Sequence, residues 1–182
     1  MDMKIRLHDL NFVPLISEEE VSRRTTELGK ELFVRLGDKN PLFIVILNGA
    51  FMFAADLVRA YNEPCEMAFV RLSSYSGTTS SGTVTASAGL NTDIAGRHVV
   101  IVEDIVDTGR TLHVFLDTLA GCQPASVTLT AFLRKPEAHI FPIQVDLTGF
   151  DIENRFVVGY GLDYDQLGRN LPGVWVLESQ SE

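Results

Sequence analysis

The sequence has few cysteines and no long apolar run. Cys65 and Cys122 are the only cysteines among 182 residues, and they do not form the CxxC spacing of metal and redox motifs. No apolar run approaches the roughly 20 residues that a membrane helix needs. Residues 1–10 alternate charged and apolar side chains and lack the apolar core of a signal peptide. We therefore expect a reduced, cytoplasmic protein without a membrane partner.

Positively charged side chains are also scarce. Fifteen Lys and Arg residues face 24 Asp and Glu residues, which gives a formal net charge of -9. Because nucleic-acid backbones are bound by clustered Lys and Arg, this balance argues against a nucleic-acid partner. It is compatible with a phosphorylated small molecule bound through backbone amides and a metal. The histidines, at positions 8, 98, 113 and 139, show no ligand spacing and predict no zinc site.

The apolar pattern alternates between strands and helices. Ser17–Glu20 predicts a capping box that opens a helix, and Gly37 ends it. Short continuous apolar runs predict buried strands at 42–47, 67–72, 98–102 and 126–133, and helical spacing predicts helices at 51–61 and 112–119. This order is typical of an α/β fold with a parallel sheet flanked by helices.

The remaining segments are less regular. Residues 73–82 are rich in Ser, Thr and Gly and predict a mobile loop, followed by an extended stretch at 83–88. Short extended pieces are expected at 145–147, 156–160 and 174–177. No repeat or linker divides the chain, so we expect one domain over 1–182.

The segment Glu103–Thr111 carries the most chemical information. A buried strand brings the adjacent carboxylates of Glu103 and Asp104 to the sheet edge where α/β proteins bind ligands. Asp107 then opens a Thr-Gly turn into a helix, whose first amides can bind a phosphate. Carboxylates that can bind a metal or sugar hydroxyls, beside a phosphate site, suit a sugar phosphate with a metal-bound leaving group. The alternative interpretation is an acidic surface loop in which Asp107 caps the helix.

This segment resembles the motif of the type I phosphoribosyltransferases that binds phosphoribosyl pyrophosphate (PRPP). Residues 156–164, Phe-Val-Val-Gly-Tyr-Gly-Leu-Asp-Tyr, resemble the C-terminal signature of the hypoxanthine-guanine phosphoribosyltransferases. Residues 47–53 resemble their pyrophosphate loop, and 73–75 the start of their catalytic loop. The resemblance implies a core over about 40–165 with a small hood from the chain ends. It also implies purine salvage, in which a 6-oxopurine and PRPP give a nucleotide product and pyrophosphate.

The resemblance also implies roles for the residues that bind PRPP. Glu103 and Asp104 would contact the ribose hydroxyls and Mg²⁺, which prefers oxygen ligands and bridges substrate phosphates. Asp107 would exchange a proton with N7 of the purine. The phosphate would bind the turn that continues through Thr108, Gly109, Arg110 and Thr111.

Two further segments of the resemblance point to the pyrophosphate. Asn48-Gly49 corresponds to a Lys-Gly pair whose peptide is often cis, and a backbone N–H there would be directed at pyrophosphate. Because this chain has Asn48, a side-chain cation is missing from that position; an ordinary strand-to-helix turn is the alternative. Arg169 would pair with pyrophosphate oxygens. Asp163, rather than the nearby Asp165, would reach the metal.

The purine would be bound by Lys135, Phe156, Val157 and Asp163, of which Asp163 is also the expected metal ligand. Lys135 would donate to O6, which favours 6-oxopurines over adenine, although its neighbour Arg134 leaves the assignment open by one residue. Phe156 would stack on the purine and Val157 would offer backbone groups to its edge; the alternative for Phe156 is core packing. For Arg155, surface and functional roles are equally open.

Ser74 and Tyr75 would lie on a loop that closes over the reaction and excludes water.

Alternatives to the leading function are a xanthine-preferring transferase, a PRPP-sensing regulator that binds nucleic acid, and an inactive homologue, for which Asn48 is the one indication. The apolar residues of 51–58 can support a homodimer or homotetramer.

Overall fold

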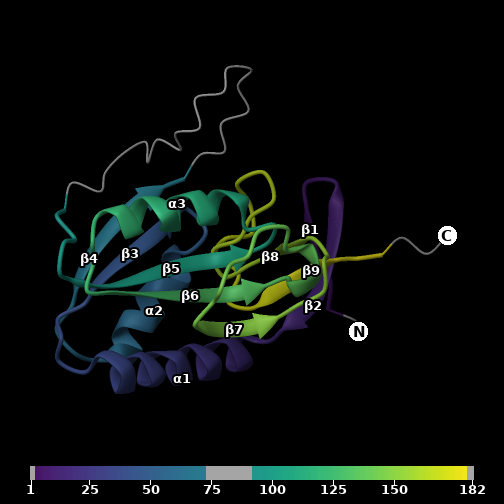
Figure 1. Cartoon of the computed structure of the whole chain (residues 1–182). Helices are drawn as coiled ribbons and strands as arrows, with labels where there is room; N and C mark the ends of the chain where they lie inside the picture. Colours follow the sequence, from purple (N-terminus) through teal and green to yellow (C-terminus); the bar gives the residue numbers. More distant parts are fainter. Residues whose placement is uncertain (1–2, 73–91, 180–182) are drawn as a thin grey trace.

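A parallel sheet forms the centre of the protein. The computed structural model describes residues 3–72 and 92–179 (Figure 1). In this part of the chain the sheet has five strands in the order β4-β3-β5-β6-β7, all paired in parallel. They are β3 (Leu42–Leu47), β4 (Glu66–Arg71), β5 (His98–Val106), β6 (Ser126–Arg134) and β7 (Leu147–Asp151). Parallel strands need helical crossovers, and these cover the sheet.

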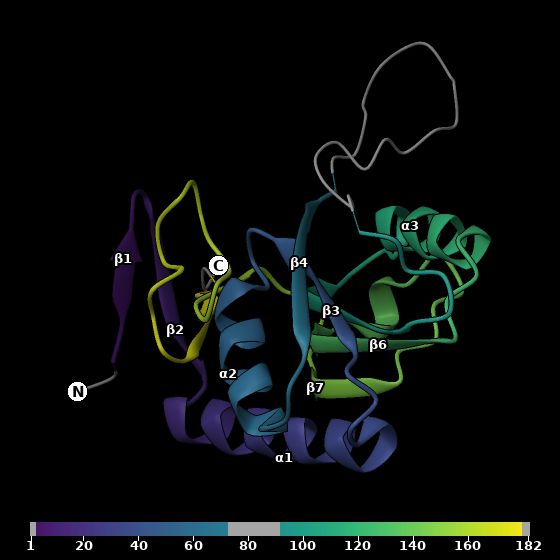
Figure 2. The same ribbon diagram turned by 90° about the vertical axis from the view of Figure 1, so that its left-hand side faces the viewer.

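Helices cover both faces of the sheet. In both views α1 (Glu18–Leu36) runs along one face and α3 (Arg110–Gly121) along the other, while α2 (Phe51–Tyr61) lies on the α1 side (Figures 1 and 2). Alternate residues of β3 divide between the two layers. Phe43 and Val45 belong to the core under α1 and α2, whereas Leu42, Ile44 and Ile46 belong to the core under α3. The strand is therefore buried on both sides, which explains its unbroken apolar run.

The ends of α1 follow the sequence. Ser17 accepts from the Glu20 amide at 3.2 Å, and the Glu20 carboxylate accepts from the Ser17 amide at 2.9 Å, which completes the predicted capping box. The Gly37 amide donates to the carbonyl of Phe33 and ends the helix. Both predicted ends of α1 are confirmed.

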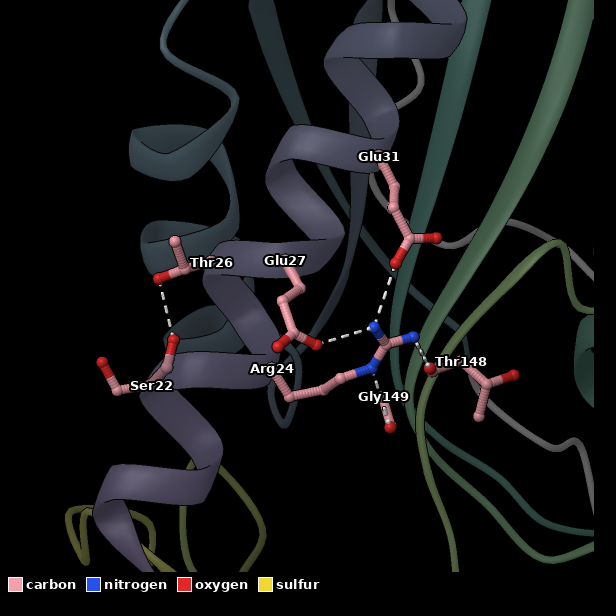
Figure 3. Close-up of polar contacts among 7 residues, drawn as sticks. All are labelled: Ser22, Arg24, Thr26, Glu27, Glu31, Thr148 and Gly149. Carbon is pink, nitrogen blue, oxygen red and sulfur yellow. Dashed lines mark hydrogen bonds and ion pairs between the residues drawn. The ribbon is translucent and has the colours of Figure 1, made fainter.

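Arg24 fixes α1 to the last strand of the sheet (Figure 3). Its guanidinium donates to the carbonyl oxygens of Thr148 at 2.8 Å and Gly149 at 3.2 Å, both on β7. The same group pairs with Glu27 at 3.2 Å and Glu31 at 3.0 Å on α1. The half-buried guanidinium thus satisfies backbone acceptors between the helix and β7.

A second, antiparallel sheet forms the hood. It contains β1 (Ile5–Leu7), β2 (Leu10–Ile16), β9 (Val174–Leu177) and β8 (Val157–Val158), in that order. It joins residues from both ends of the chain and lies beyond the carboxyl ends of the parallel strands (Figure 1). The hood therefore stands over the edge at which α/β sheets bind ligands.

Several boundaries differ from the prediction. The strand expected at 98–102 continues to Val106, because Glu103, Ile105 and Val106 pair with β6. The piece expected at 145–147 lies instead at Leu147–Asp151, where Phe150 packs edge-on against Phe132 at 5.8 Å. The loop and extended stretch expected at 73–88 lie outside the described residues.

A short 3-10 helix, Pro136–Ala138, follows β6. Within residues 3–72 and 92–179, no helix has the length and apolar character to span a membrane.

Candidate active site

Glu103 and Asp104 lie in the last part of β5, at the sheet edge that faces the hood. The Glu103 Oε2 atom is buried and has no hydrogen-bond partner among the described residues. Burial raises the pKa of Glu103 well above its ordinary value, and the charge of Asp104 raises it further. A buried carboxyl oxygen without a donor is costly, and it is suited to a hydroxyl or a cation.

Asp104 is held in place by the backbone. Its Oδ1 atom accepts from the Ile105 amide at 2.8 Å. Burial raises the pKa of Asp104 to about 6, although that hydrogen bond and the positive charge of Arg169 act in the opposite direction. The negative charge of Asp163 adds to the rise. Asp104, Asp163 and Arg169 are therefore close enough to interact electrostatically.

A cavity of about 250 Å³ connects the carboxylates with the loop after β3. Its lining includes Asn48, Gly49, Glu103, Asp104 and Thr111. Gly49 is packed directly on Asp104, since a Cβ atom at position 49 would lie 1.4 Å from Asp104 Oδ2. Only glycine allows this approach of loop and carboxylate. The structure thus brings together two predicted groups that are far apart in the sequence.

The loop after β3 contains a cis peptide between Leu47 and Asn48. The resemblance placed it at the Asn48–Gly49 bond, so the cis peptide lies one bond earlier than expected. The carbonyl of Gly49 contacts Gly161, where a Cβ atom would lie 1.9 Å from that oxygen. The loop is therefore enclosed between Asp104 on one side and Gly161 on the other.

The turn after β5 leads into α3 as the sequence predicted, but Asp107 does not cap the helix. The N-cap is Gly109, with φ of 80°, and it makes no side-chain cap hydrogen bond. The turn is supported instead from the segment after β6, because the Thr108 carbonyl accepts from the amides of Ile140 at 3.1 Å and Phe141 at 3.2 Å. The interpretation of Asp107 as a helix cap is wrong, and its carboxylate is available for other contacts.

Lys135 faces Asp107 across the sheet edge. Its side chain is buried, and Nζ lies 3.7 Å from Asp107 Oδ2. Its backbone amide donates to the Val106 carbonyl at 2.9 Å. The neighbouring Arg134 pairs through Nε and Nη2 with the two carboxylate oxygens of Asp151, both at 2.7 Å. Of the two basic residues that the sequence left open, Lys135 is the one directed at Asp107.

Phe156 and Val157, two of the predicted purine-binding residues, lie in the hood. The Phe156 side chain is 43% exposed, and its ring centroid lies 6.1 Å from that of Phe12 and 5.8 Å from that of Tyr164. Val157 is buried in β8. A partly exposed ring supported by other aromatic rings does not belong to a closed core and offers a surface for stacking.

Asp163 and Arg169 form an ion pair. Arg169 Nη2 lies 2.7 Å from Asp163 Oδ1, and Nη1 donates to the Gly161 carbonyl at 2.8 Å. Asp165 is instead exposed and contacts His8, so Asp163 is the carboxylate that lies next to the loop. Arg155 donates to the Leu177 carbonyl at 2.9 Å and thus has a structural contact in the hood.

Two predicted residues lie outside the described part of the chain, and one contact in the site was not predicted. Ser74 and Tyr75 lie outside the described residues, and their roles stay predictions. Arg71 was not predicted; its Nη2 donates to Asn48 Oδ1 at 3.1 Å. No sequence signal indicates this contact, because the two residues are 23 positions apart.

The described residues contain no cluster of three or more His, Cys, Asp or Glu side chains suited to a metal ion. The predicted metal ligands Glu103, Asp104 and Asp163 therefore do not form such a cluster in the structure.

A parallel sheet with paired carboxylates, an adjoining turn into a helix and a small hood together have the fold of a type I phosphoribosyltransferase. The family model described as "Phosphoribosyl transferase domain" matches residues 17–165. The chain belongs to the hypoxanthine-guanine phosphoribosyltransferase family, whose members are enzymes of purine salvage. The predicted fold class, enzyme class and family are confirmed.

Family membership rests on close similarity over most of the chain. The hypoxanthine-guanine phosphoribosyltransferase of Streptococcus pneumoniae is 42% identical over 91% of this chain and 93% of its own length. That of Lactococcus lactis is 44% identical over 91% of both proteins. The structure of a Staphylococcus aureus hypoxanthine phosphoribosyltransferase, 35% identical, matches 91% of this chain and 90% of its own with a TM-score of 0.85.

Proposed function

We propose that this protein transfers the 5-phosphoribosyl group of PRPP to the 6-oxopurines hypoxanthine and guanine, in the cytoplasm. The products are the corresponding nucleotide and pyrophosphate. One observation carries the choice of base: the buried Lys135 lies 3.7 Å from Asp107 at the sheet edge beside the paired carboxylates. A cation cannot accept a hydrogen bond, so Lys135 favours a 6-oxo oxygen over the 6-amino group of adenine.

Each residue of this pair has a separate role in the reaction. N9 of the base forms a bond with C1′ of the ribose, while the bond from C1′ to the pyrophosphate oxygen breaks and its electron pair leaves with pyrophosphate. The proton on N7 of the base passes to the Asp107 carboxylate. Lys135 donates to O6, the atom beside N7 on the same purine edge. Phe156 stacks on the base, and Val157 contributes backbone groups to its edge.

The phosphoribosyl part of PRPP is assigned to the adjacent groups. Glu103 and Asp104 receive the ribose hydroxyls, and the turn of Thr108, Gly109, Arg110 and Thr111 binds the 5-phosphate at the amino end of α3. The backbone of Asn48 and Gly49 contacts pyrophosphate, and Arg169 contacts its oxygens. In the described structure Arg169 pairs with Asp163, so this contact requires the ion pair to open or to share the guanidinium.

The donor set fits Mg²⁺. The buried Glu103 Oε2 atom lacks a partner among the described residues, and the adjacent Asp104 supplies a second oxygen donor. Glu103 and Asp104, with Asp163 on the pyrophosphate side, would hold the ion together with PRPP. When bound, the ion supplies positive charge that stabilises the departing pyrophosphate.

We also propose that residues 1–182 form one domain and that it assembles as a homodimer or homotetramer. The predicted surface at 51–58 is largely used inside the subunit, since Phe53, Ala54 and Leu57 are buried. Exposed apolar side chains do occur at Phe51, 41% exposed, and on the edge strand β4 at Phe69, 50% exposed. Exposed apolar residues beside a sheet edge favour association. Light scattering coupled to size-exclusion chromatography tests the assembly.

The reaction is tested by pyrophosphate release from PRPP and Mg²⁺, with hypoxanthine, guanine, xanthine, adenine and uracil offered in parallel. We expect turnover with hypoxanthine and guanine and none with adenine or uracil. A rate that is highest with xanthine would replace the proposal by a xanthine-preferring enzyme. Tight PRPP binding without turnover on any base would point to a PRPP-sensing regulator or an inactive homologue.

A further inference from the structure

Acidic side chains line the cavity beside the loop 47–49. Glu103 and Asp104 line it, and Asp163 is close enough to raise the pKa of Asp104. An anionic substrate that enters this cavity meets carboxylates and must be balanced by cations. Asn48 lines the cavity with an uncharged side chain. Beyond Mg²⁺ and Arg169, any positive charge on this side of the loop must therefore come from a residue other than Asn48.

Arg71 lies beside the part of the loop that contains Asn48. In the parallel pairing of β3 with β4, Arg71 is opposite Leu47, the last residue before the loop. Its Nη2 atom donates to Asn48 Oδ1 at 3.1 Å, and the next residue, Leu72, lines the same cavity. Asn48 is the only hydrogen-bond partner of the Arg71 guanidinium among the described residues. An arginine carries five N–H groups, so the remaining donors are available to a ligand.

The opposite side of the loop carries the second cation. Gly49 contacts Gly161, and Arg169 donates to the Gly161 carbonyl at 2.8 Å while it pairs with Asp163 at 2.7 Å. Arg71 therefore donates directly to the loop residue Asn48, whereas Arg169 is connected to the loop through Gly161, which contacts Gly49. The partners of the two arginines differ in charge, since Arg169 pairs with the carboxylate of Asp163 and Arg71 with the neutral amide of Asn48.

We infer that Arg71 is a pyrophosphate-binding residue and that Asn48 is the positioning residue that orients it. The inference rests on the proposed function, and it gives the Asn48 side chain a defined role. Its amide oxygen directs a guanidinium toward the substrate instead of supplying a charge itself. A neutral partner is suited to this, because it holds the guanidinium without neutralising it. Guanidinium groups bind phosphate oxygens through two parallel hydrogen bonds.

The inference is tested by calorimetric titration of the full chain with pyrophosphate in the presence of Mg²⁺. For Arg71→Gln we expect the dissociation constant to rise roughly ten- to a hundredfold, the range for a hydrogen bond to a charged group. The KM for hypoxanthine should change less than twofold. The matched control is Arg23→Gln, which removes an exposed arginine of α1 and should bind pyrophosphate as the parent does. An unchanged dissociation constant for Arg71→Gln, with an unchanged melting temperature, would overturn the inference.

The positioning role of Asn48 is tested by a double-mutant cycle. Asn48→Ala alone should weaken pyrophosphate binding by less than Arg71→Gln. The double variant should bind no more weakly than Arg71→Gln, because Asn48 acts through Arg71. Losses that multiply would show that the two side chains act independently and would refute the positioning role.

Failure of the inference and failure of the proposed function give different results. If the parent binds pyrophosphate and Arg71→Gln does not, but no base is turned over, the inference stands and the transfer reaction fails. If the parent is active and Arg71→Gln binds pyrophosphate normally, the reaction stands and the inference fails. A parent that binds no pyrophosphate contradicts both.

Discussion

The ammonium nitrogen of Lys135 lies 3.7 Å from a carboxylate oxygen of Asp107, although the two residues belong to different strand–loop segments. The sheet register produces this contact. Val106 at the end of β5 pairs with Arg134 at the end of β6. The residues that follow these two strands, Asp107 and Lys135, therefore lie at the same edge of the sheet. Two adjacent parallel strands thus deliver a donor and an acceptor side by side. The purine edge that carries O6 and N7 offers them matching partners.

We expect Lys135→Ala to weaken the binding of hypoxanthine and guanine much more than that of PRPP. The loss of a hydrogen bond from a charged donor should raise the KM for the base roughly ten- to a hundredfold. Steady-state kinetics with each substrate varied in turn measure both constants.

Arg134→Ala is the matched control, because it removes the neighbouring basic residue, whose guanidinium is bound to Asp151. It should leave the KM for the base nearly unchanged. A larger effect of Arg134→Ala than of Lys135→Ala would show that Arg134, and not Lys135, donates to O6.

Asp107→Asn should reduce turnover while PRPP binding stays near normal. The amide keeps the shape of the side chain but cannot take a proton from N7, and a general base of this kind contributes about 10²- to 10⁴-fold. Calorimetry with PRPP and Mg²⁺ gives the affinity, and pyrophosphate release gives kcat. Turnover equal to that of the parent would remove Asp107 as the proton acceptor.

Gly49→Ala should abolish PRPP binding, because the new methyl group would lie 1.4 Å from Asp104 Oδ2 and force loop and carboxylate apart. The control is Gly121→Ala at the end of α3, where a Cβ atom has no neighbour within 4 Å. PRPP affinity and melting temperature should be measured for both. Normal affinity in Gly49→Ala would show that the contact of the loop with Asp104 is not required for binding.

The sequence predicted the core well because its local signals agree with the tertiary contacts. The β3 and β5 runs are buried on both faces, so their apolar residues are continuous, and the capping box of α1 is complete within four residues. The hood was harder to predict. β8 has only two residues, and β9 pairs on its other side with β2 from the opposite end of the chain, so the hood has little local signal.

The same distinction between local signals and tertiary contacts applies to the candidate site. Glu103, Asp104 and the turn after them form one contiguous motif and could be found from the sequence. The contact of Arg71 with Asn48 depends on the register of two parallel strands, and the contact of Gly49 with Gly161 depends on the close packing of two loops. Such relationships are set by three-dimensional packing, for which spacing in the sequence gives no measure.

Asp104 should make the stability of the ligand-free protein depend on pH. Burial raises its pKa from 3.8 to about 6, so the folded state binds this proton more tightly than the unfolded state. The resulting stabilisation is complete below pH 4 and is lost as the pH rises through 6. The free energy of unfolding should fall by at most about 3 kcal/mol over this window, at 1.4 kcal/mol per pKa unit.

Urea unfolding without Mg²⁺ at pH 4.5 and 7.5 measures this loss, and Asp104→Asn should remove much of it, so that the variant gains stability relative to the parent at the higher pH. Asp151→Asn is a control of opposite sign, because the hydrogen bonds from Arg134 lower the pKa of Asp151 and its contribution is present above pH 4. That variant should lose stability relative to the parent as the pH rises. Equal pH dependence in the parent and Asp104→Asn would mean that Asp104 is ionised without cost in the folded protein, and its carboxylate would then need no bound cation for compensation.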